Sequence, residues 1–428
     1  MQGEAAQPKG IKARRVETVL AGSVHASPAP KPSAGVSQNC SHEYKRKLYT
    51  IYRIADGRKV RQFSCTRQRG FLMTDRPVLI VGAGPTGLTA ALELARQGVI
   101  ADIVDKRAAA SGFSRAVGIT PRSMDILAES GATEALVSAG ISIHDLIAYR
   151  GQKQILNVSL ATNKLKNDFL LALPQDQTEK TLVNFFEQLG GRVEYNKAIR
   201  SLIQRGDNVE VFFQDGSMTT YEYVYGADGI HSTVRQTVSL DFPGFDLRKK
   251  WAIADVDATG WIHPKTFSVY FCGRSQAVIV APIGTNRYRV ISNTHDSIAT
   301  LPFEMNVTRV RAENSFRVSV RQVKTYQKDR VFLGGDAAHC HSPVGGRGMN
   351  LGIADGAEFA RRFVTGALEG YSQARYGDAA SVIRKTERAR HFIMSANPLN
   401  HFVIDRLAKF ANKSEWAQRT ISRALLTE

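Results

Sequence analysis

Three glycine-bearing turns, each following a short apolar segment, are the features of this sequence best suited to chemistry. The most informative runs from Gly334 to Asn350 and carries Asp336, His339 and a second glycine cluster. We expect a helix to begin near Gly348, where unpaired backbone N–H groups would create partial positive charge. Asp336 offers a carboxylate for a ligand hydroxyl. The segment therefore suits an anionic or polarised cofactor rather than a metal.

A second turn has the spacing G-x-G-x-x-G, with Gly82, Gly84 and Gly87 between an apolar strand and a helix. In this context the first glycine makes the turn, the second admits a pyrophosphate and the third lets the helix pack on the strand. The next apolar strand ends at Asp105, where an acidic side chain can bind a ribose hydroxyl. The combination predicts a dinucleotide site.

The third turn runs from Tyr225 to Arg235 and contains Asp228-Gly229, with Ser232 as a candidate helix N-cap. For this segment alone, an ordinary strand-to-helix connection explains the pattern equally well.

Taken in this order, the three segments resemble the motifs of the p-hydroxybenzoate hydroxylase-like, single-component (group A) FAD-dependent aromatic monooxygenases. GAGPTG resembles the ADP-binding turn, GADGIHSTVR the "DG" motif and GGDAAHCHSPVGGRGMNLGIADG the "GD" motif. The resemblance covers about Thr74 to Arg390 and includes Tyr371 and Arg375 after the last motif. One departure is Asp105, because the family usually has glutamate there; the shorter side chain keeps the two acceptor oxygens.

The resemblance implies a set of FAD-contacting residues. They are Gly82, Gly84, Pro85, Thr86, Gly87, Asp105, Lys106, Arg115, Gln175, Asp228, Arg235, Gly335, Asp336, Pro343, Gly346, Gly348, Met349 and Asn350. Within this set, Asp336 would hold the ribityl chain, Pro343 would shape the pocket beside flavin C4a, and the N–H groups at residues 348–350 would face the pyrimidine edge. Arg115 and Arg235 would serve the pyrophosphate or NAD(P)H, although a surface charge or a structural ion pair is the alternative for each.

The resemblance also implies the reaction. NADH or NADPH would reduce FAD, and O2 would add at flavin C4a to give a hydroperoxide that hydroxylates a small phenolic ring. We expect His339 and His341 to be structural rather than catalytic. Tyr149, His263, Tyr270 and His144 are candidates for the group that activates the phenol, and the sequence does not choose among them.

Other functions fit the same motifs. A ubiquinone-pathway hydroxylase, an epoxidase or a reductase would use the same flavin framework, whereas a halogenase is disfavoured because W-x-W-x-I-P is missing. From other classes, the chain could be a non-catalytic flavin-binding redox module, or a nucleic-acid binder acting through its basic N-terminal residues.

Composition narrows these alternatives. The net charge is +18, but residues 1–73 hold 14 Lys/Arg and 4 Asp/Glu, so only +8 remains on residues 74–428. We therefore expect no nucleic-acid partner. The four cysteines lack metal-ligand spacing and suit a reducing compartment, and no apolar run is long enough to span a bilayer. We expect a cytoplasmic monomer or homodimer without a metal.

The first 72 residues form a separate, basic segment. We expect it to be a disordered extension or the product of a mis-assigned start, with Met73 as the favoured natural start; a transit peptide and a genuine basic arm are the alternatives. A short hairpin is predicted within it, between Lys47 and Phe63 around Asp56-Gly57.

The predicted fold is mixed α/β. A Rossmann-like FAD-binding domain (73–145, 174–245 and 320–370) would be interrupted by an antiparallel β-sheet substrate domain (146–173 and 246–319), and helices would form residues 371–428. Alternating apolar residues between Trp251 and Asn293 predict a sheet with one buried face. Amphipathic helices are predicted at Tyr371–Arg390 and Val403–Leu426.

Overall fold

The computed structural model describes residues 49–53, 59–63, 76–110, 116–160, 167–273, 275–343, 345–395 and 397–426. The chain divides into two units, Met1–Arg46 and Lys47–Glu428, and the first lies wholly outside the described residues. The second unit opens with strands β1 (Tyr49–Arg53) and β2 (Lys59–Phe63), which pair in antiparallel register. The predicted hairpin is therefore confirmed.

A six-stranded sheet organises the nucleotide-binding half of the molecule. Its strands, in order across the sheet, are β10 (Val193–Glu194), β4 (Asp102–Val104), β3 (Val78–Val81), β14 (Tyr223–Gly226), β21 (Val331–Leu333) and β20 (Gln327–Lys328). The first five are parallel and β20 is antiparallel to β21. In a parallel sheet the carboxyl ends of the strands share one edge, so the turns that follow β3, β14 and β21 lie together.

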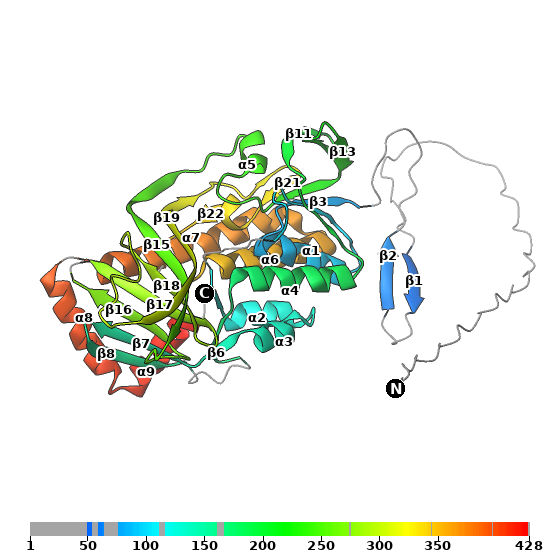
Figure 1. Ribbon diagram of the computed structural model, residues 1–428. Coiled ribbons are helices and arrows are strands. Elements are labelled where there is room, and N and C mark those ends of the chain that lie inside the picture. The colour runs from blue at the N-terminus through cyan, green and yellow to red at the C-terminus, as the bar shows by residue number, and fades with distance from the viewer. Residues whose placement is uncertain are drawn as a thin grey trace, which may run out of the picture. The chain divides into compact units, whose positions relative to one another are not determined.

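A helix follows each of the three glycine-bearing turns. Helix α1 (Pro85–Arg96) begins with a proline, which suits a first helical turn, and nearly all its side chains are buried because it packs against α4 (Gln175–Gln188) as well as α6 (Gly348–Thr365). In Figure 1, α1 and α6 lie below the strand β3, and α4 lies below these two helices. A further helix, α5 (Thr233–Thr237), follows β14, and a short 3-10 helix η1 (Gly335–Ala337) follows β21.

An eight-stranded sheet forms the other half. Its strands, in order, are β22 (His339–Cys340), β19 (Asn306–Gln322), β15 (Gly244–Thr259), β18 (Arg287–Ser292), β17 (Gln276–Gly284), β16 (Phe267–Cys272), β7 (Asp145–Arg150) and β8 (Lys153–Ser159). The pairs are antiparallel, as predicted, except that β16 and β7 run parallel.

The prediction that only one face of this sheet is buried is wrong. Every residue of β18 after Arg287 is buried, so both faces are covered. On one face Tyr288 and Val290 join an apolar cluster capped by Phe303 and Met305 from the loop before β19. On the other face Arg289 reaches the carbonyl oxygen of Ala116 in the nucleotide-binding half. Alternation along a strand does not reveal that a distant loop covers the second face.

Smaller elements complete the fold. One three-stranded sheet consists of β11 (Ile199–Arg205), β12 (Asn208–Phe213) and β13 (Met218–Tyr221). A second three-stranded sheet consists of β5 (Gly118–Ile119), β9 (Leu170–Ala172) and β6 (Ile141–Ile143). The remaining helices are α2 (Pro121–Ala128), α3 (Ala132–Ala139) and η2 (Leu368–Gly370).

The C-terminal residues form three helices, α7 (Tyr371–Ile393), α8 (Pro398–Ala411) and α9 (Glu415–Leu426). The predicted single helix at Val403–Leu426 is thus wrong in one respect. It is interrupted after Ala411, where Ser414 accepts a hydrogen bond from the backbone N–H of Ala417 and starts a new helix. In the described part of the chain, no helix has both the length and the apolar character needed to cross a membrane.

Candidate functional site

The turn after β3 contains three glycines, and the structure requires a glycine at two of these positions. Gly82 has φ of +108° and lies against Ala227, so a side chain there would be strained and would overlap the neighbouring carbonyl. A Cβ atom on Gly87 would overlap the carbonyl oxygen of Gly82. A Cβ atom on Gly84 would meet no described atom within 4 Å. The first and third glycines therefore serve packing, while the second leaves open space at the start of α1.

The three motifs lie against one another. Gly82 contacts Ala227 and Asp228 of the second motif, and the Thr86 side chain fills the position that a Cβ on Gly335 would occupy. Pro85 is buried at the first position of α1, and Thr86 is half-buried. Segments that are far apart in sequence thus build one edge of the parallel sheet.

Asp105 is fully engaged at the end of β4. Its Oδ2 accepts hydrogen bonds from the Ala83 N–H at 2.8 Å and from Arg107 Nη2 at 2.9 Å, and its Oδ1 accepts from the backbone and Nε of Arg107. Burial works to raise the pKa of Asp105, but the hydrogen bonds from Arg107 outweigh burial and hold that pKa below its ordinary value. Lys106, the adjacent predicted residue, is exposed.

Arg107 connects Asp105 to the predicted Gln175. Its Nη1 donates to Glu179 at 3.1 Å, and Glu179 also accepts a hydrogen bond from Gln175 Nε2 at 2.8 Å. Glu179 is fully buried, so Arg107 compensates two carboxylates at once. The role of Arg107 was not predicted, because its only signal in the sequence is an arginine two positions after the acidic residue.

The turn after β14 is organised by Asp228. Its Oδ2 accepts hydrogen bonds from the N–H groups of Thr233 and Val234 at 2.7 and 3.1 Å, which caps α5. Its Oδ1 is shielded from solvent and has no hydrogen-bond partner among the described residues. Burial raises the pKa of Asp228 above its ordinary value. An oxygen left in this condition is available to a ligand.

Arg235 has a structural position. Its guanidinium donates to the carbonyl oxygens of Ala337 and Ile230, both at 2.8 Å, and it lies 4.0 Å from the ring centre of Phe242. It therefore ties the second motif to the third.

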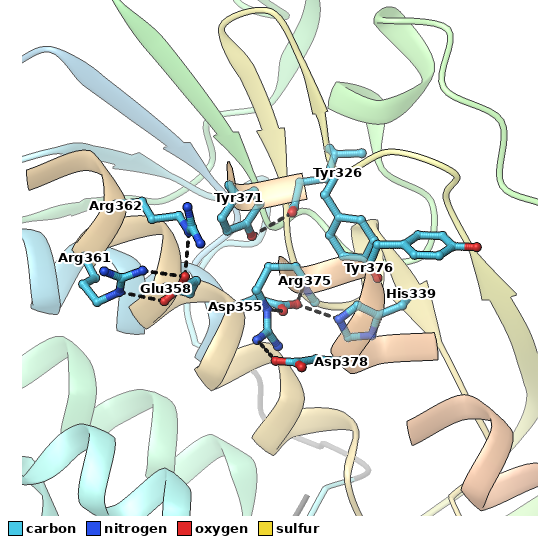
Figure 2. Close-up of polar contacts among 12 residues, drawn as sticks. Tyr326, His339, Asp355, Glu358, Arg361, Arg362, Tyr371, Arg375, Tyr376 and Asp378 are labelled. Atoms are coloured by element: carbon cyan, nitrogen blue, oxygen red, sulfur yellow. Dashed lines mark hydrogen bonds and ion pairs between the residues drawn. The ribbon is translucent and has the colours of Figure 1, made fainter. Parts of the chain in front are cut away.

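A buried carboxylate holds the third motif in place. Asp355 of α6 accepts hydrogen bonds from the backbone N–H of Gly335 at 2.8 Å, from His339 Nε2 at 2.6 Å and from Arg375 Nε at 2.5 Å. Figure 2 shows Asp355 between His339 and Arg375, with Tyr371 close by. His339 is thus held as a structural group, and Asp336 between Gly335 and His339 presents an exposed side chain.

Helix α6 begins at Gly348, as predicted, and its N-cap residue Arg347 makes no side-chain capping hydrogen bond. The Asn350 side chain instead joins the helix start to a distant segment: its Oδ1 accepts from the Thr120 N–H at 2.9 Å and its Nδ2 donates to the Gly118 carbonyl at 2.9 Å. Met349 is buried beneath this start. The uncapped backbone N–H groups carry the partial positive charge of the helix end.

The loop before α6 contains Pro343, which is half-buried, and Gly346, which is exposed and closes a turn by donating its N–H to the Pro343 carbonyl at 3.0 Å. His341 lies beside this turn. Its Nδ1 is 2.8 Å from the Ser342 carbonyl, and its Nε2 is shielded from solvent without a described hydrogen-bond partner. Burial lowers the pKa of His341 to about 4, so the ring is neutral at pH 7.

The candidate phenol-activating residues do not gather at this site. Tyr149, His263 and Tyr270 form one aromatic cluster, with the Tyr149 hydroxyl 2.7 Å from His263 Nε2 and the two tyrosine rings stacked at 5.1 Å. Tyr149 and Tyr270 belong to the apolar cluster that lies on the sheet face opposite Arg289. His144 is exposed. Arg115 lies outside the described residues, so its predicted contact has no structural counterpart here.

The face of the eight-stranded sheet that points toward the nucleotide-binding half carries a buried ion pair. Arg289 Nε and Nη2 donate to the two oxygens of Asp255 at 2.7 and 2.9 Å, and Arg289 Nη1 donates to the Ala116 carbonyl at 2.9 Å. This contact joins the large sheet to the chain just before β5, which the Asn350 side chain also holds. Neither Arg289 nor Asp255 lies in a sequence motif, so this ion pair was not predicted.

Comparison with known proteins agrees with this arrangement. The FAD binding domain family matches residues 75–300 and 285–386 of the chain. An uncharacterized aromatic compound monooxygenase of Bacillus subtilis is 29% identical over 74% of this chain and 68% of its own length. A rifampicin monooxygenase of Streptomyces venezuelae is 30% identical over 75% of this chain and 72% of its own length.

Among solved structures, a p-nitrophenol 4-monooxygenase from Pseudomonas putida superposes with a TM-score of 0.75. The two sequences are 22% identical, and the match covers 82% of this chain and 98% of the other, so this likeness concerns the fold. The chain belongs to the FAD binding domain family. Together with its relatives, this membership makes it an FAD-dependent monooxygenase.

The residues present fit FAD at most positions. The open space at Gly84, the uncapped starts of α1 and α6 and the unpartnered oxygen of Asp228 are all available to a ligand. Asp105 is the exception, because Ala83 and Arg107 fill its acceptor positions. A ribose hydroxyl can reach Asp105 only if the Arg107 side chain gives up part of this contact.

Proposed function

We propose that the chain hydroxylates a small phenolic substrate, using NADH or NADPH and O2, with FAD held along the edge formed by the three motifs. The observation that carries this proposal is the convergence of two uncapped helix starts with Asp105, Asp228 and the Gly335 turn. The names of the two curated relatives and of the structural neighbour, which concern aromatic compounds, rifampicin and p-nitrophenol, support an aromatic substrate.

The proposed roles follow from the chemistry of each group. Backbone N–H groups at the start of α1, beside Gly84, would hold the pyrophosphate, and Asp105 would bind the ribose. Asp336 would hold the ribityl hydroxyls. When bound, FAD supplies the electron transfer and oxygen activation that amino-acid side chains cannot. The N–H groups of residues 348–350 would stabilise negative charge on the reduced ring.

Other residues would shape the pocket rather than react. Pro343 has a rigid ring and no N–H, so it would form a wall that excludes water beside the cofactor. The neutral imidazole of His341 offers an unshared acceptor at Nε2, next to Gly348, that can receive a hydrogen bond. Gln175, through Glu179 and Arg107, would set the position of the Asp105 carboxylate.

We further propose that residues 73–145, 174–245 and 320–370 act as the FAD-binding domain and residues 146–173 and 246–319 as the substrate domain. Arg289 and Asp255 would hold the large sheet against the nucleotide-binding half. The few cysteines support action in a reducing cytoplasm, as a monomer or homodimer.

The test is reconstitution of the purified chain with FAD, followed by a screen of phenols against NADH and NADPH. We expect a yellow protein, substrate-stimulated oxidation of one nicotinamide, matching O2 uptake and a product heavier by one oxygen atom. Failure to retain FAD would contradict the whole proposal. Retention of FAD with no phenol stimulating turnover would contradict the substrate class alone.

A further inference from the structure

Helix α8 presents its large apolar side chains to solvent. Its exposed apolar residues are Leu399, Phe402, Val403, Leu407 and Phe410, with exposures between 37% and 65%. At 100° per residue these positions form one continuous stripe along the helix. Trp416, at the start of α9, is 72% exposed. Soluble helices normally turn such a stripe toward the core, so the stripe on α8 indicates a partner surface.

The opposite side of α8 accounts for its docking onto the protein. Ala408 and Ala411 are buried, Asn412 donates from Nδ2 to the Ile155 carbonyl of β8 at 2.9 Å, and Asp405 pairs with Arg150 of β7 at 2.9 Å. Figure 1 shows α8 and α9 beside the strands β7 and β8. Small and polar residues therefore attach the helix, and the large apolar residues remain available.

The charge around the stripe is basic. Arg406 and Lys409 are exposed, and the helical spacing places them beside the apolar residues, while Lys413 is exposed just after the end of α8. The only acidic residue of α8 is Asp405, which is held by Arg150. From residue 371 to 426 the chain has ten Lys/Arg and four Asp/Glu. An apolar stripe with a basic rim is typical of a helix that lies in the interface of an anionic membrane.

From these observations we propose that the α8 face, defined as Leu399, Phe402, Val403, Leu407 and Phe410 with Arg406, Lys409 and Lys413, docks onto an anionic membrane surface. With 14 residues, α8 is about 21 Å long and too short to span a bilayer, so it lies in the membrane plane. A second copy of the chain would oppose basic rim to basic rim, which disfavours a symmetric dimer through this face. The proposal does not depend on the monooxygenase reaction.

The test uses the full chain and vesicles of phosphatidylcholine, with or without an equal amount of phosphatidylserine. The protein should float with the phosphatidylserine vesicles at low salt, and Trp416 should report the contact. Of the three tryptophans, Trp251 and Trp261 are 2% and 6% exposed, so a blue shift of the emission on vesicle addition would come from Trp416.

Two variant pairs separate the α8 face from the basic N-terminal residues, which stay unchanged in every protein. Phe402→Ser with Phe410→Ser, and separately Lys409→Glu with Lys413→Glu, should each weaken vesicle binding by roughly tenfold or more and abolish the blue shift. Ile203→Ser with Met218→Ser removes two apolar side chains, 40% and 47% exposed, from β11 and β13 and should leave binding unchanged.

Three results would overturn the proposal. The first is the absence of vesicle binding by the unmodified chain. The second is equal binding by the α8 variants, which would assign the membrane contact to another segment. The third is a dimer in size-exclusion chromatography that Phe402→Ser with Phe410→Ser dissociates, which would assign the face to a second copy.

Discussion

The Nε2 atom of His339 lies 2.6 Å from Oδ2 of Asp355, and both side chains are buried. This pair joins the turn after β21 to the middle of α6. The same Asp355 oxygen receives the Gly335 N–H, and its other oxygen receives Arg375. Burial works to raise the pKa of Asp355, but Arg375 and His339 outweigh burial and hold it below its ordinary value. An ionised Asp355 therefore fixes the turn that carries Asp336.

Replacing Asp355 with asparagine should destabilise the protein by about 3 kcal/mol, because the buried Arg375 would lose its buried partner and keep only the half-exposed Asp378. FAD affinity should fall as well, since the Gly335 turn loses its anchor. Urea unfolding of the FAD-free chain and flavin-fluorescence titration measure the two effects. The matched control is Glu358→Gln on the same helix, which pairs with Arg361 and Arg362 (Figure 2). Arg361 is 56% exposed and Arg362 is partly buried, so neither charge would be left fully buried, and the loss should be less than about 1 kcal/mol. Equal losses in both variants would refute the anchoring role.

Substitutions of the glycines in the first motif should separate effects on FAD binding from effects on folding. Gly84→Ala places its Cβ in open space, and the Gly84 backbone, with φ of −82°, accommodates alanine. The free chain should therefore keep its melting temperature while FAD binds roughly tenfold or more weakly, because the new methyl group would meet the pyrophosphate. Gly87→Ala should lower the melting temperature itself, since its Cβ overlaps the Gly82 carbonyl. Unchanged FAD affinity in Gly84→Ala would place the pyrophosphate elsewhere.

The sequence predicts the edge of the parallel sheet that carries the three motifs well, because the signals that mark it are local. Glycine spacing, strand ends and helix starts each depend on a few neighbouring residues, so Gly82, Gly335 and Gly348 lie in the turns and helix start that the sequence indicates. Contacts across long stretches of chain were missed for the opposite reason. The Arg107–Glu179 pair joins residues 72 positions apart, and Arg289 reaches Ala116 over 173. No spacing rule reports such pairs.

The same limit explains why the sequence did not show where the candidate phenol-activating residues lie. Side-chain type alone made Tyr149, His263 and Tyr270 candidates for phenol activation, but strand register decides which face of a sheet a residue occupies. Val278 and Val280 share the face of Tyr270, whereas Arg289 points toward the nucleotide-binding half. Register depends on pairing with distant strands, so the sequence could not assign these residues to a face.

Asp105 should be required for FAD binding even though Arg107 engages it. Asp105→Asn keeps the size of the side chain and removes its charge, so we expect FAD affinity to fall about 10- to 100-fold, the range for a lost hydrogen bond to a charged group. Titration of the FAD-free chain with FAD measures the change. Asp102→Asn on the same strand, where the carboxylate pairs with Arg76 and Tyr221, is the control and should leave FAD affinity unchanged. If Asp105→Asn binds FAD as well as the unmodified chain, another group holds the ribose.

His341 should make the protein sensitive to acid. Its pKa is lowered to about 4 by burial, whereas an ordinary histidine has a pKa of 6.5. Between pH 6.5 and pH 4 the His341 imidazole is protonated in the unfolded chain but not in the folded chain. The free energy of unfolding should therefore fall as the pH drops from 6.5 toward 4. His341→Gln cannot titrate, and its melting temperature should drop about 2–4 °C less between pH 7 and pH 5 than that of the unmodified chain. His391→Gln, which alters a histidine whose side chain is 70% exposed, should keep the full acid sensitivity. Because the comparison is between two pH values within each variant, a uniform loss of packing in His341→Gln would cancel, and an unchanged pH dependence would show that His341 is not the group that resists protonation.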